Sequence, residues 1–262
     1  MQSKNPVFSR SQSAGWGSQA TPTPQQLQNM YDSPSYVPPA QPAYRTMTID
    51  DVVVRGFMTL GTLVVAAAAS WYLQVPMGVA IGSAIVALVL GLIASFSMST
   101  NPLLILSYAA FQGVFLGAVS SVFDANINGI VVQAVLGTAM AFAGTLAVYT
   151  LRIIRVTPKL VKYVVAAAIA ALGLIVVNLI AGFFVDGGLG LRDGGPLAIV
   201  FSVAMILLGC FFLLLDFDSI EQGVKQGAPE KFAWQCAFGL TLSLVWIYIE
   251  LLRLISYFAS SD

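Results

Sequence analysis

Residues 196–215 read PLAIVFSVAMILLGCFFLLL, a run without a single charge, and Asp216 and Asp218 follow it at once. A helix rises 1.5 Å per residue, so about twenty apolar residues are enough to cross the roughly 30 Å hydrocarbon core of a bilayer. A carboxylate at the boundary of such a span is costly, and acids kept there usually mark an ion pathway, a proton site or a paired switch. This stretch therefore predicts a membrane-spanning helix that ends in a candidate functional group.

The chain as a whole is strongly apolar. Of its 262 residues 58% are hydrophobic and 9% are charged, with a mean hydropathy of +0.84, whereas soluble domains carry about 25% charged residues. Seven runs are long enough to cross the membrane: 52–73, 78–96, 103–123, 130–149, 163–185, 197–215 and 232–258. Because backbone groups in lipid must satisfy their own hydrogen bonds, each run is expected to be a helix. We predict an all-α integral membrane protein with seven transmembrane helices in residues 47–262.

Residues 1–46 differ from this domain in composition, being rich in Ser, Gln, Pro and Tyr, and are predicted to be a disordered tail. The basic residues of the tail and of alternate loops fall on one side of the membrane. They are Lys4, Arg10, Arg45, Arg152, Arg155, Lys159, Lys162, Lys225 and Lys231. The charged residues of the opposite loops are Asp124, Asp186, Arg192 and Asp193. The positive-inside rule then predicts a multi-pass plasma-membrane protein with a cytoplasmic N-terminus and an outer C-terminus.

The sequence contains no histidine, and its two cysteines, Cys210 and Cys236, lie in apolar runs. Histidine-ligated zinc and histidine-activated nucleophiles are therefore excluded, and we expect neither an enzyme nor a resident cofactor. Any pH response has to come from carboxylates, because there is no imidazole. With twelve basic and twelve acidic residues and no basic stripe, we expect the lipid bilayer rather than nucleic acid as the partner.

Five charged residues in or beside the spans are candidates for gating or ion binding. Asp216 and Asp218 are about 200° apart around a helix, so only one of them can face the bundle interior. Glu250 lies deep in the last span and shares a helix face with Arg253, so the two form either a structural ion pair or a protonatable group. Arg55, near the start of the first span, either reaches the headgroups or neutralises Asp218.

Small residues predict where helices approach closely. Gly78 and Gly82, and likewise Gly113 and Gly117, have the G-x-x-x-G spacing. This spacing lets helix backbones approach each other in lipid, where apolar surfaces gain little by meeting. We expect these four glycines to be helix-packing positions.

Four stretches resemble a known family. They are NPVFS at 5–9, YAAFQGVFLGAVS at 108–120, FDSI at 217–220 and LVWIYIELLR at 244–253. Together with seven spans, they resemble the Bax inhibitor-1 family, also called transmembrane Bax inhibitor motif proteins. The stretches at 5–9 and 244–253 are similar to its bacterial, YccA-like branch.

The resemblance implies a fold in which six helices surround the C-terminal one. It also implies a pH-sensitive cation leak, with calcium as the permeant ion, controlled by two aspartates near the cytoplasmic side of the last two helices. Asp218 would be the first of them and a candidate calcium ligand, but residues 241–246 contain no acid to serve as the second. Gln112 stands where the resemblance leads us to expect an acid. The alternative function is a non-transporting regulator that binds a membrane protease or quality-control complex.

Overall fold

The computed structural model describes residues 23–25, 28, 45–185 and 188–259. Nearly all of the predicted tail, with Lys4, Arg10 and the stretch 5–9, lies outside these residues, and so does Asp186. The described residues from Arg45 onward form one compact helical unit.

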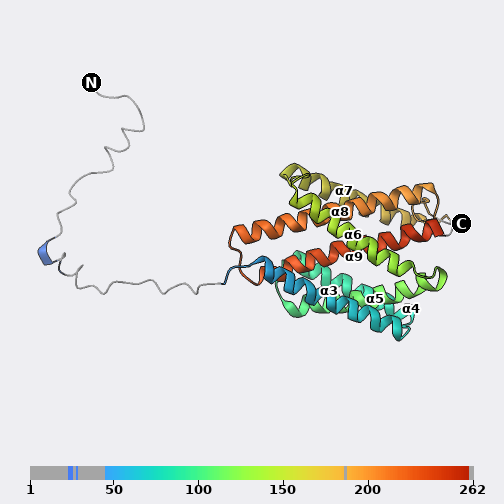
Figure 1. The fold of residues 1–262 in the computed structure, drawn as a ribbon, viewed down its shortest axis with the longest axis horizontal. Helices are drawn as coiled ribbons and strands as arrows, with labels where there is room; N and C mark the ends of the chain where they lie inside the picture. Colours follow the sequence, from blue (N-terminus) through green and yellow to red (C-terminus); the bar gives the residue numbers. More distant parts are fainter. Residues whose placement is uncertain (1–22, 26–27, 29–44, 186–187, 260–262) are drawn as a thin grey trace, which may run out of the picture. The chain divides into compact units, whose positions relative to one another are not determined.

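Seven long helices make up this unit (Figure 1). They are α3 (Ile49–Tyr72), α4 (Met77–Phe96), α5 (Pro102–Asn126), α6 (Ile130–Thr150), α7 (Pro158–Ala181), α8 (Pro196–Lys225) and α9 (Phe232–Ala259). All seven are long and apolar enough to span a membrane, and the described residues form no strand. The predicted all-α, seven-helix fold is confirmed.

Local sequence signals fix where these helices begin. Thr48 and Asp51 form a reciprocal capping box at the start of α3. Asn101 and Thr157 accept hydrogen bonds from the first turns of α5 and α7, each of which has proline at its first position. The helices therefore start at capping residues, which need not coincide with the edges of the apolar runs.

The end of α8 differs from the prediction. Its apolar run stops at residue 215, but the helix continues for ten more residues to Lys225. Gly227, with φ of +65°, lets the chain turn back, and Ala228 N–H donates to the carbonyl of Gly223 at 2.9 Å. Hydropathy predicted where the apolar segment ends, but the helix itself ends later, at the turn formed by Gly227. Asp216 and Asp218 therefore lie inside α8 and not at its terminus.

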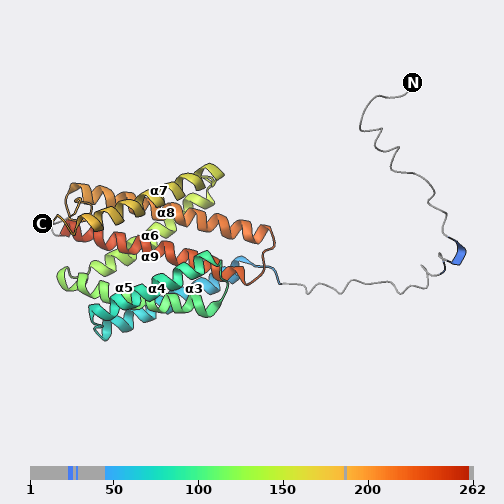
Figure 2. The ribbon, with the colours of Figure 1, turned by 180° about the vertical axis from the view of Figure 1, so that it is seen from behind.

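Helix α9 runs through the middle of the unit in both ribbon views (Figures 1 and 2). Its closest helix neighbours are α8, α3, α6 and α5, so the ring that the family resemblance implied is uneven. Helix α4 packs mainly on α5, and α7 packs on α8. These outer helices meet α9 through long side chains, with Phe238 touching the α4–α5 cluster and Trp246 touching the α7–α8 cluster.

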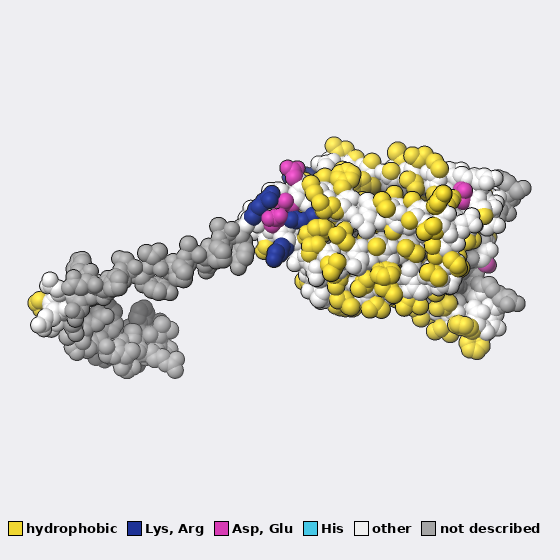
Figure 3. Space-filling model, turned by 90° about the horizontal axis from the view of Figure 1, so that it is seen from below, with side chains coloured by type: hydrophobic (Ala, Val, Ile, Leu, Met, Phe, Trp, Pro, Cys, Tyr) yellow, Lys and Arg dark blue, Asp and Glu magenta, His cyan; other side chains and the backbone are white. Residues whose placement is uncertain are grey.

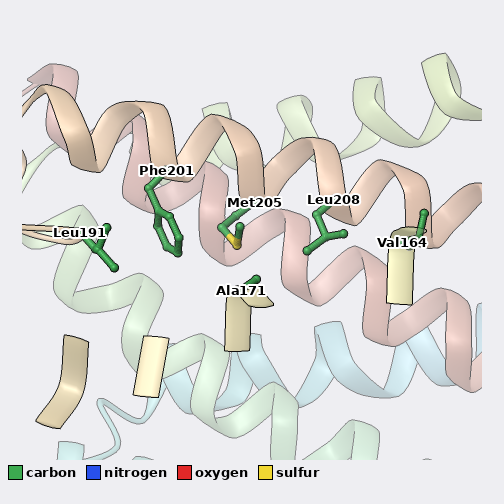
Figure 4. Packing of buried hydrophobic residues seen from close by; sticks show 6 residues of the cluster. All are labelled: Val164, Ala171, Leu191, Phe201, Met205 and Leu208. Carbon is green, nitrogen blue, oxygen red and sulfur yellow. The ribbon is translucent and has the colours of Figure 1, made fainter. Parts of the chain in front are cut away.

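The α7–α8 contact is a compact apolar cluster formed mainly by these two helices (Figure 4). Its buried members are Val164, Ala171, Leu191, Phe201, Met205 and Leu208. Most of the remaining surface of α7 is exposed and apolar, as expected for a helix that faces lipid.

The two glycine pairs have different roles. A Cβ at Gly113 or Gly117 would overlap the backbone carbonyl of Leu63 or Ala67, so the predicted close approach is present between α5 and α3. A Cβ at Gly78 or Gly82 would meet nothing within 4 Å. The expected packing role of this second pair is absent within the described unit, because that face of α4 has no helix against it.

Charge is distributed unevenly along the bundle. Lys and Arg side chains gather at one end of the helical bundle, while its sides are largely hydrophobic (Figure 3). We call this the basic end; it includes residues 45–48 and the loops 151–157 and 226–231. The opposite end, which contains the loop before Pro196, is called the far end.

Candidate functional site

One group of polar residues in the bundle interior lies where α8 meets α9. Ser202, Gly209 and Asp216 are seven residues apart along α8, a spacing that keeps them on one helix face. Gly209 marks this face as the one toward α9, because a Cβ there would lie 2.6 Å from Ile247 Cγ1. The indole Nε1–H of Trp246 donates to the carbonyl of Met205 at 3.0 Å, which fixes the two helices at the same level.

Asp216 is the carboxylate on this face. Ser243 Oγ of α9 donates to Asp216 Oδ2 at 2.6 Å. The other carboxylate oxygen, Oδ1, packs against Gly239 of α9. A Cβ on Gly239 would lie only 2.8 Å from this oxygen, so the contact requires glycine. Within the described residues no basic group pairs with Asp216. We call Asp216, Ser243 and Gly239 the Asp216 cluster.

The choice between the two aspartates therefore differs from the sequence-based expectation. Only one of them faces α9, as helical geometry requires, but it is Asp216 and not Asp218. Asp218 is partly buried on another face of α8, where Gln222 Nε2 donates to its Oδ2 at 2.5 Å. The rotation of α8 about its axis is set by close packing at Gly209 and Gly239, and this cannot be read from hydropathy.

Arg55 forms an ion pair with Glu230 and not with Asp218. Its guanidinium donates to the backbone carbonyl and to the carboxylate of Glu230, both at 2.5 Å, and lies over the Trp234 ring at 5.6 Å. The alternative that Arg55 neutralises Asp218 is thus wrong for this structure. Glu230 was missed because it lies in a short polar loop, and no local spacing links it to a residue 175 positions earlier.

Segment 45–48 closes the basic end over this ion pair. Met47 N–H donates to the carbonyl of Ala228 at 2.8 Å, and Glu230 N–H donates to that of Arg45 at 2.9 Å. The Arg45 side chain lies 3.3 Å from Asp51 and 3.8 Å from Glu230. Backbone and side-chain contacts together fasten the start of α3 to the turn between α8 and α9.

Toward the far end, Glu250 lies among arginines. Its predicted pairing with Arg253 is present, with Nη1 2.7 Å from Oε1. Arg192, from the loop before α8, joins the same oxygen at 3.4 Å. Glu250 is only 4% exposed, and its Oε2 has no hydrogen-bond partner among the described residues. We call Glu250, Arg253 and Arg192 the Glu250 cluster.

Arg192 was not singled out from the sequence, since it lies in a loop. Loss of solvent around its guanidinium lowers the pKa of Arg192, and the nearby Arg253 adds to this effect while Glu250 opposes it. The cation also lies 6.0 Å from the Phe201 ring. Arg192 is therefore a half-buried part of the interface rather than a fully exposed surface charge.

An apolar layer separates the two clusters. Leu213 of α8 and Ile247 of α9 are fully buried and pack together with Phe217. Gly209 allows Ile247 to fill the space between the helices. In this arrangement no polar side chain of the described residues bridges the Asp216 cluster and the Glu250 cluster.

The chemistry open to the two clusters is different. Asp216 can take up a proton or offer an oxygen to a hard cation, because no counter-ion competes for it. Glu250 is already held by two guanidinium groups and would have to release them first. Within the described residues no three acidic or cysteine side chains gather as a metal site.

Comparison with known proteins gives one family match. The family model described as Bax inhibitor 1 like matches residues 5–260, which is nearly the whole chain. No curated protein matches the sequence.

Proposed function

The chain belongs to the Bax inhibitor 1 like family, and from this premise we propose that it is a pH-sensitive cation leak, with calcium as the permeant ion. In this proposal an intramembrane carboxylate near the basic end of α8 controls the pathway. The proposal assigns no catalytic step and no resident cofactor to the chain. It places the protein in the plasma membrane, in contact with the lipid bilayer.

The observation that carries the proposal is the position of Asp216. It faces the central helix, accepts a hydrogen bond from Ser243 and has no cationic partner in the described residues. A carboxylate without a counter-ion inside a transmembrane bundle is costly and is expected to have a functional reason. Asp218, one helical turn from Glu221 and Gln222, is the second acid of this region and the one that matches the family signature.

The proposed pathway follows the α8–α9 interface. The apolar layer at Leu213 and Ile247 blocks it, and the Arg55–Glu230 pair closes its basic end. Protonation of Asp216 removes a charge from the interface, which changes the balance between closed and open packing of α8 against α9. When Asp216 is ionised, its oxygen atoms and that of Ser243 are the ligands that a hard cation would meet first.

Orientation is part of the proposal. The described basic residues Arg152, Arg155 and Lys225 lie at the same end as Arg45, and cytoplasmic loops carry such an excess. We therefore infer that the basic end faces the cytoplasm and that the C-terminus lies outside. The Asp216 cluster would then be reached from the cytoplasm and the Glu250 cluster from the outer side.

The experiment is calcium flux from proteoliposomes that contain only the purified protein, measured between about pH 5 and 8. Wild type should show flux that changes with pH. Asp216→Asn carries no charge at any pH, so its flux should stay at the level that wild type reaches at the acidic limit. Flux in Asp216→Asn that follows pH as in wild type would overturn the assignment to Asp216.

A second function, a non-transporting regulator that binds a membrane protease or quality-control complex, is favoured by one observation. The α9 partner of Asp216 is the hydroxyl of Ser243 and not a second carboxylate, so a two-acid latch is missing from this interface. The same flux measurement separates the two functions. A purified protein that folds but carries no flux at any pH, and that co-purifies with one membrane protein from native membrane, supports the regulator.

A further inference from the structure

A groove on the side of the bundle lies outside the α8–α9 interface. It runs between α6 and α8 and has a volume of about 300 Å³, at the lower end of the range for ligand pockets. Its lining includes Ala141, Gly144 and Val148 of α6, Leu207 and Phe211 of α8, and Ile154 of the loop after α6. The walls are thus almost entirely apolar, and from residue 141 to 148 they extend about 10 Å along the helix axis.

The open space in the groove is created at particular positions. Gly144 lacks a side chain, and a Cβ there would meet nothing within 4 Å. Phe211, on the opposite wall, also packs against the cluster that holds α7 to α8. The groove therefore separates α6 from the place where α7 attaches.

The basic end of the groove is formed by the loop between α6 and α7. Ile154 lines the groove, and the exposed Arg152 and Arg155 lie two residues before and one residue after it. Lys159 and Lys162 follow in the first turns of α7. In the part of the chain that is described, Arg155, Lys159 and Lys162 form no ion pair.

Acidic groups nearby do not cancel this charge. Glu221 pairs with Lys225 and accepts a hydrogen bond from Tyr149, and Arg152 lies within electrostatic range of it. Asp218 is the other acid at this corner and is engaged by Gln222. At the mouth of the groove, guanidinium and ammonium groups therefore outnumber the carboxylates.

We propose that this groove is a binding site for an anionic phospholipid, with an acyl chain between α6 and α8 and the phosphate on Arg155 and Arg152. An apolar slot that ends at exposed arginines matches a molecule with an apolar chain and an anionic head, and arginine binds phosphate in a bidentate manner. The lipid would fill the space beside Phe211 and so support the attachment of α7. The proposal does not depend on ion transport.

The test measures which lipid stays bound. The full-length protein is reconstituted in vesicles of equal parts phosphatidylglycerol and phosphatidylcholine, extracted in mild detergent and examined by native mass spectrometry. We expect wild type to retain phosphatidylglycerol in preference to phosphatidylcholine. Equal retention of the two lipids, or retention of neither, would overturn the proposal.

Two matched variants test the groove itself. Gly144→Leu places a side chain in the open space and should lower the retained lipid several-fold. Gly173→Leu is its control, because Gly173 lies on the exposed face of α7 and a Cβ there also meets nothing within 4 Å. Should Gly144→Leu express poorly, Leu207→Trp fills the groove from the other wall. Unchanged retention in a folded groove-filling variant would count against the site.

The headgroup is tested separately. The double variant Arg152→Gln/Arg155→Gln should still retain lipid but lose the preference for phosphatidylglycerol. Lys231→Gln removes a charge at the same end but away from the groove, and should leave that preference unchanged. If the double variant loses phosphatidylglycerol while Gly144→Leu does not, the loop attracts anionic lipid without the groove, and the proposal is wrong.

Discussion

The Glu250 cluster and the Asp216 cluster lie on the same pair of helices, yet they balance their carboxylates differently. Glu250 is held by two guanidinium groups, at 2.7 and 3.4 Å, whereas Asp216 is held by one hydroxyl at 2.6 Å. Two guanidinium groups on one carboxylate tie the loop before α8 to α9 and so fix the cluster in place. A carboxylate beside a hydroxyl can gain or lose a proton with little rearrangement. The comparison separates a structural fastening from a group that can change state.

The largest effect on stability is expected at the Glu250 cluster. Arg253→Met removes the closer cation from a buried carboxylate and should lower the free energy of unfolding by about 3 kcal/mol, because one partner of a buried pair is left behind. Thermal unfolding in detergent measures this loss. The double variant Glu250→Gln/Arg253→Met, which removes both charges, should recover part of it. If the single variant is as stable as wild type, Glu250 is not fixed by charge and the contrast between the clusters fails.

A smaller loss is expected at the basic end. Arg55→Met removes two charge-assisted hydrogen bonds to Glu230 and should lower the free energy of unfolding by about 1.5 kcal/mol. Arg45→Met is the matched control; its side chain is 68% exposed, so its pair with Glu230 should contribute less than about 0.5 kcal/mol. Equal losses in the two variants would show that burial does not decide the strength of these pairs.

At the Asp216 cluster stability and activity should separate. Asp216→Asn keeps an oxygen that can accept from Ser243, so the free energy of unfolding should change by less than about 1 kcal/mol. The pH dependence of calcium flux should nevertheless be lost. A large loss of stability with unchanged flux would make Asp216 a structural residue like Glu250 and would remove the contrast.

The smallest effect is expected at Asp218. This residue contacts Gln222 on its own helix, and Asp218→Asn should change the free energy of unfolding by less than about 0.5 kcal/mol. Flux should retain its pH dependence if Asp216 is the controlling group. Flux that loses its pH dependence in Asp218→Asn but not in Asp216→Asn would return the assignment to the residue that the family signature favours.

The parts of the fold that depend on local sequence could be predicted. The number of spans follows from hydropathy, and Glu250 with Arg253 follows from a three-residue spacing on one helix. The partner of Arg55 could not be predicted, because Glu230 comes near it only through the tertiary fold. The same holds for the choice of Asp216 over Asp218, since the rotation of α8 is set by close packing at Gly209 of α8 and Gly239 of α9.

The glycine pairs show the same limit in another way. Gly113 with Gly117 and Gly78 with Gly82 have identical spacing, but only the first pair meets a helix backbone. The G-x-x-x-G spacing allows another helix to approach closely, but the arrangement of the neighbouring helices decides whether one does. The described structure places a helix on one of these faces and none on the other.

The short backbone bridge between residues 45–48 and the turn after α8 has a mechanical consequence. Met47 and Glu230 each contribute an N–H to it, so the chain that precedes α3 is attached to the α8–α9 turn and not only to its own helix. Force on the chain before residue 45 is therefore transmitted to the two helices that hold Asp216. Any pulling force on the N-terminal segment would act on that helix pair. It would act at a point some 15 Å along α8 from the Asp216 carboxylate, because about ten residues of helix separate the two.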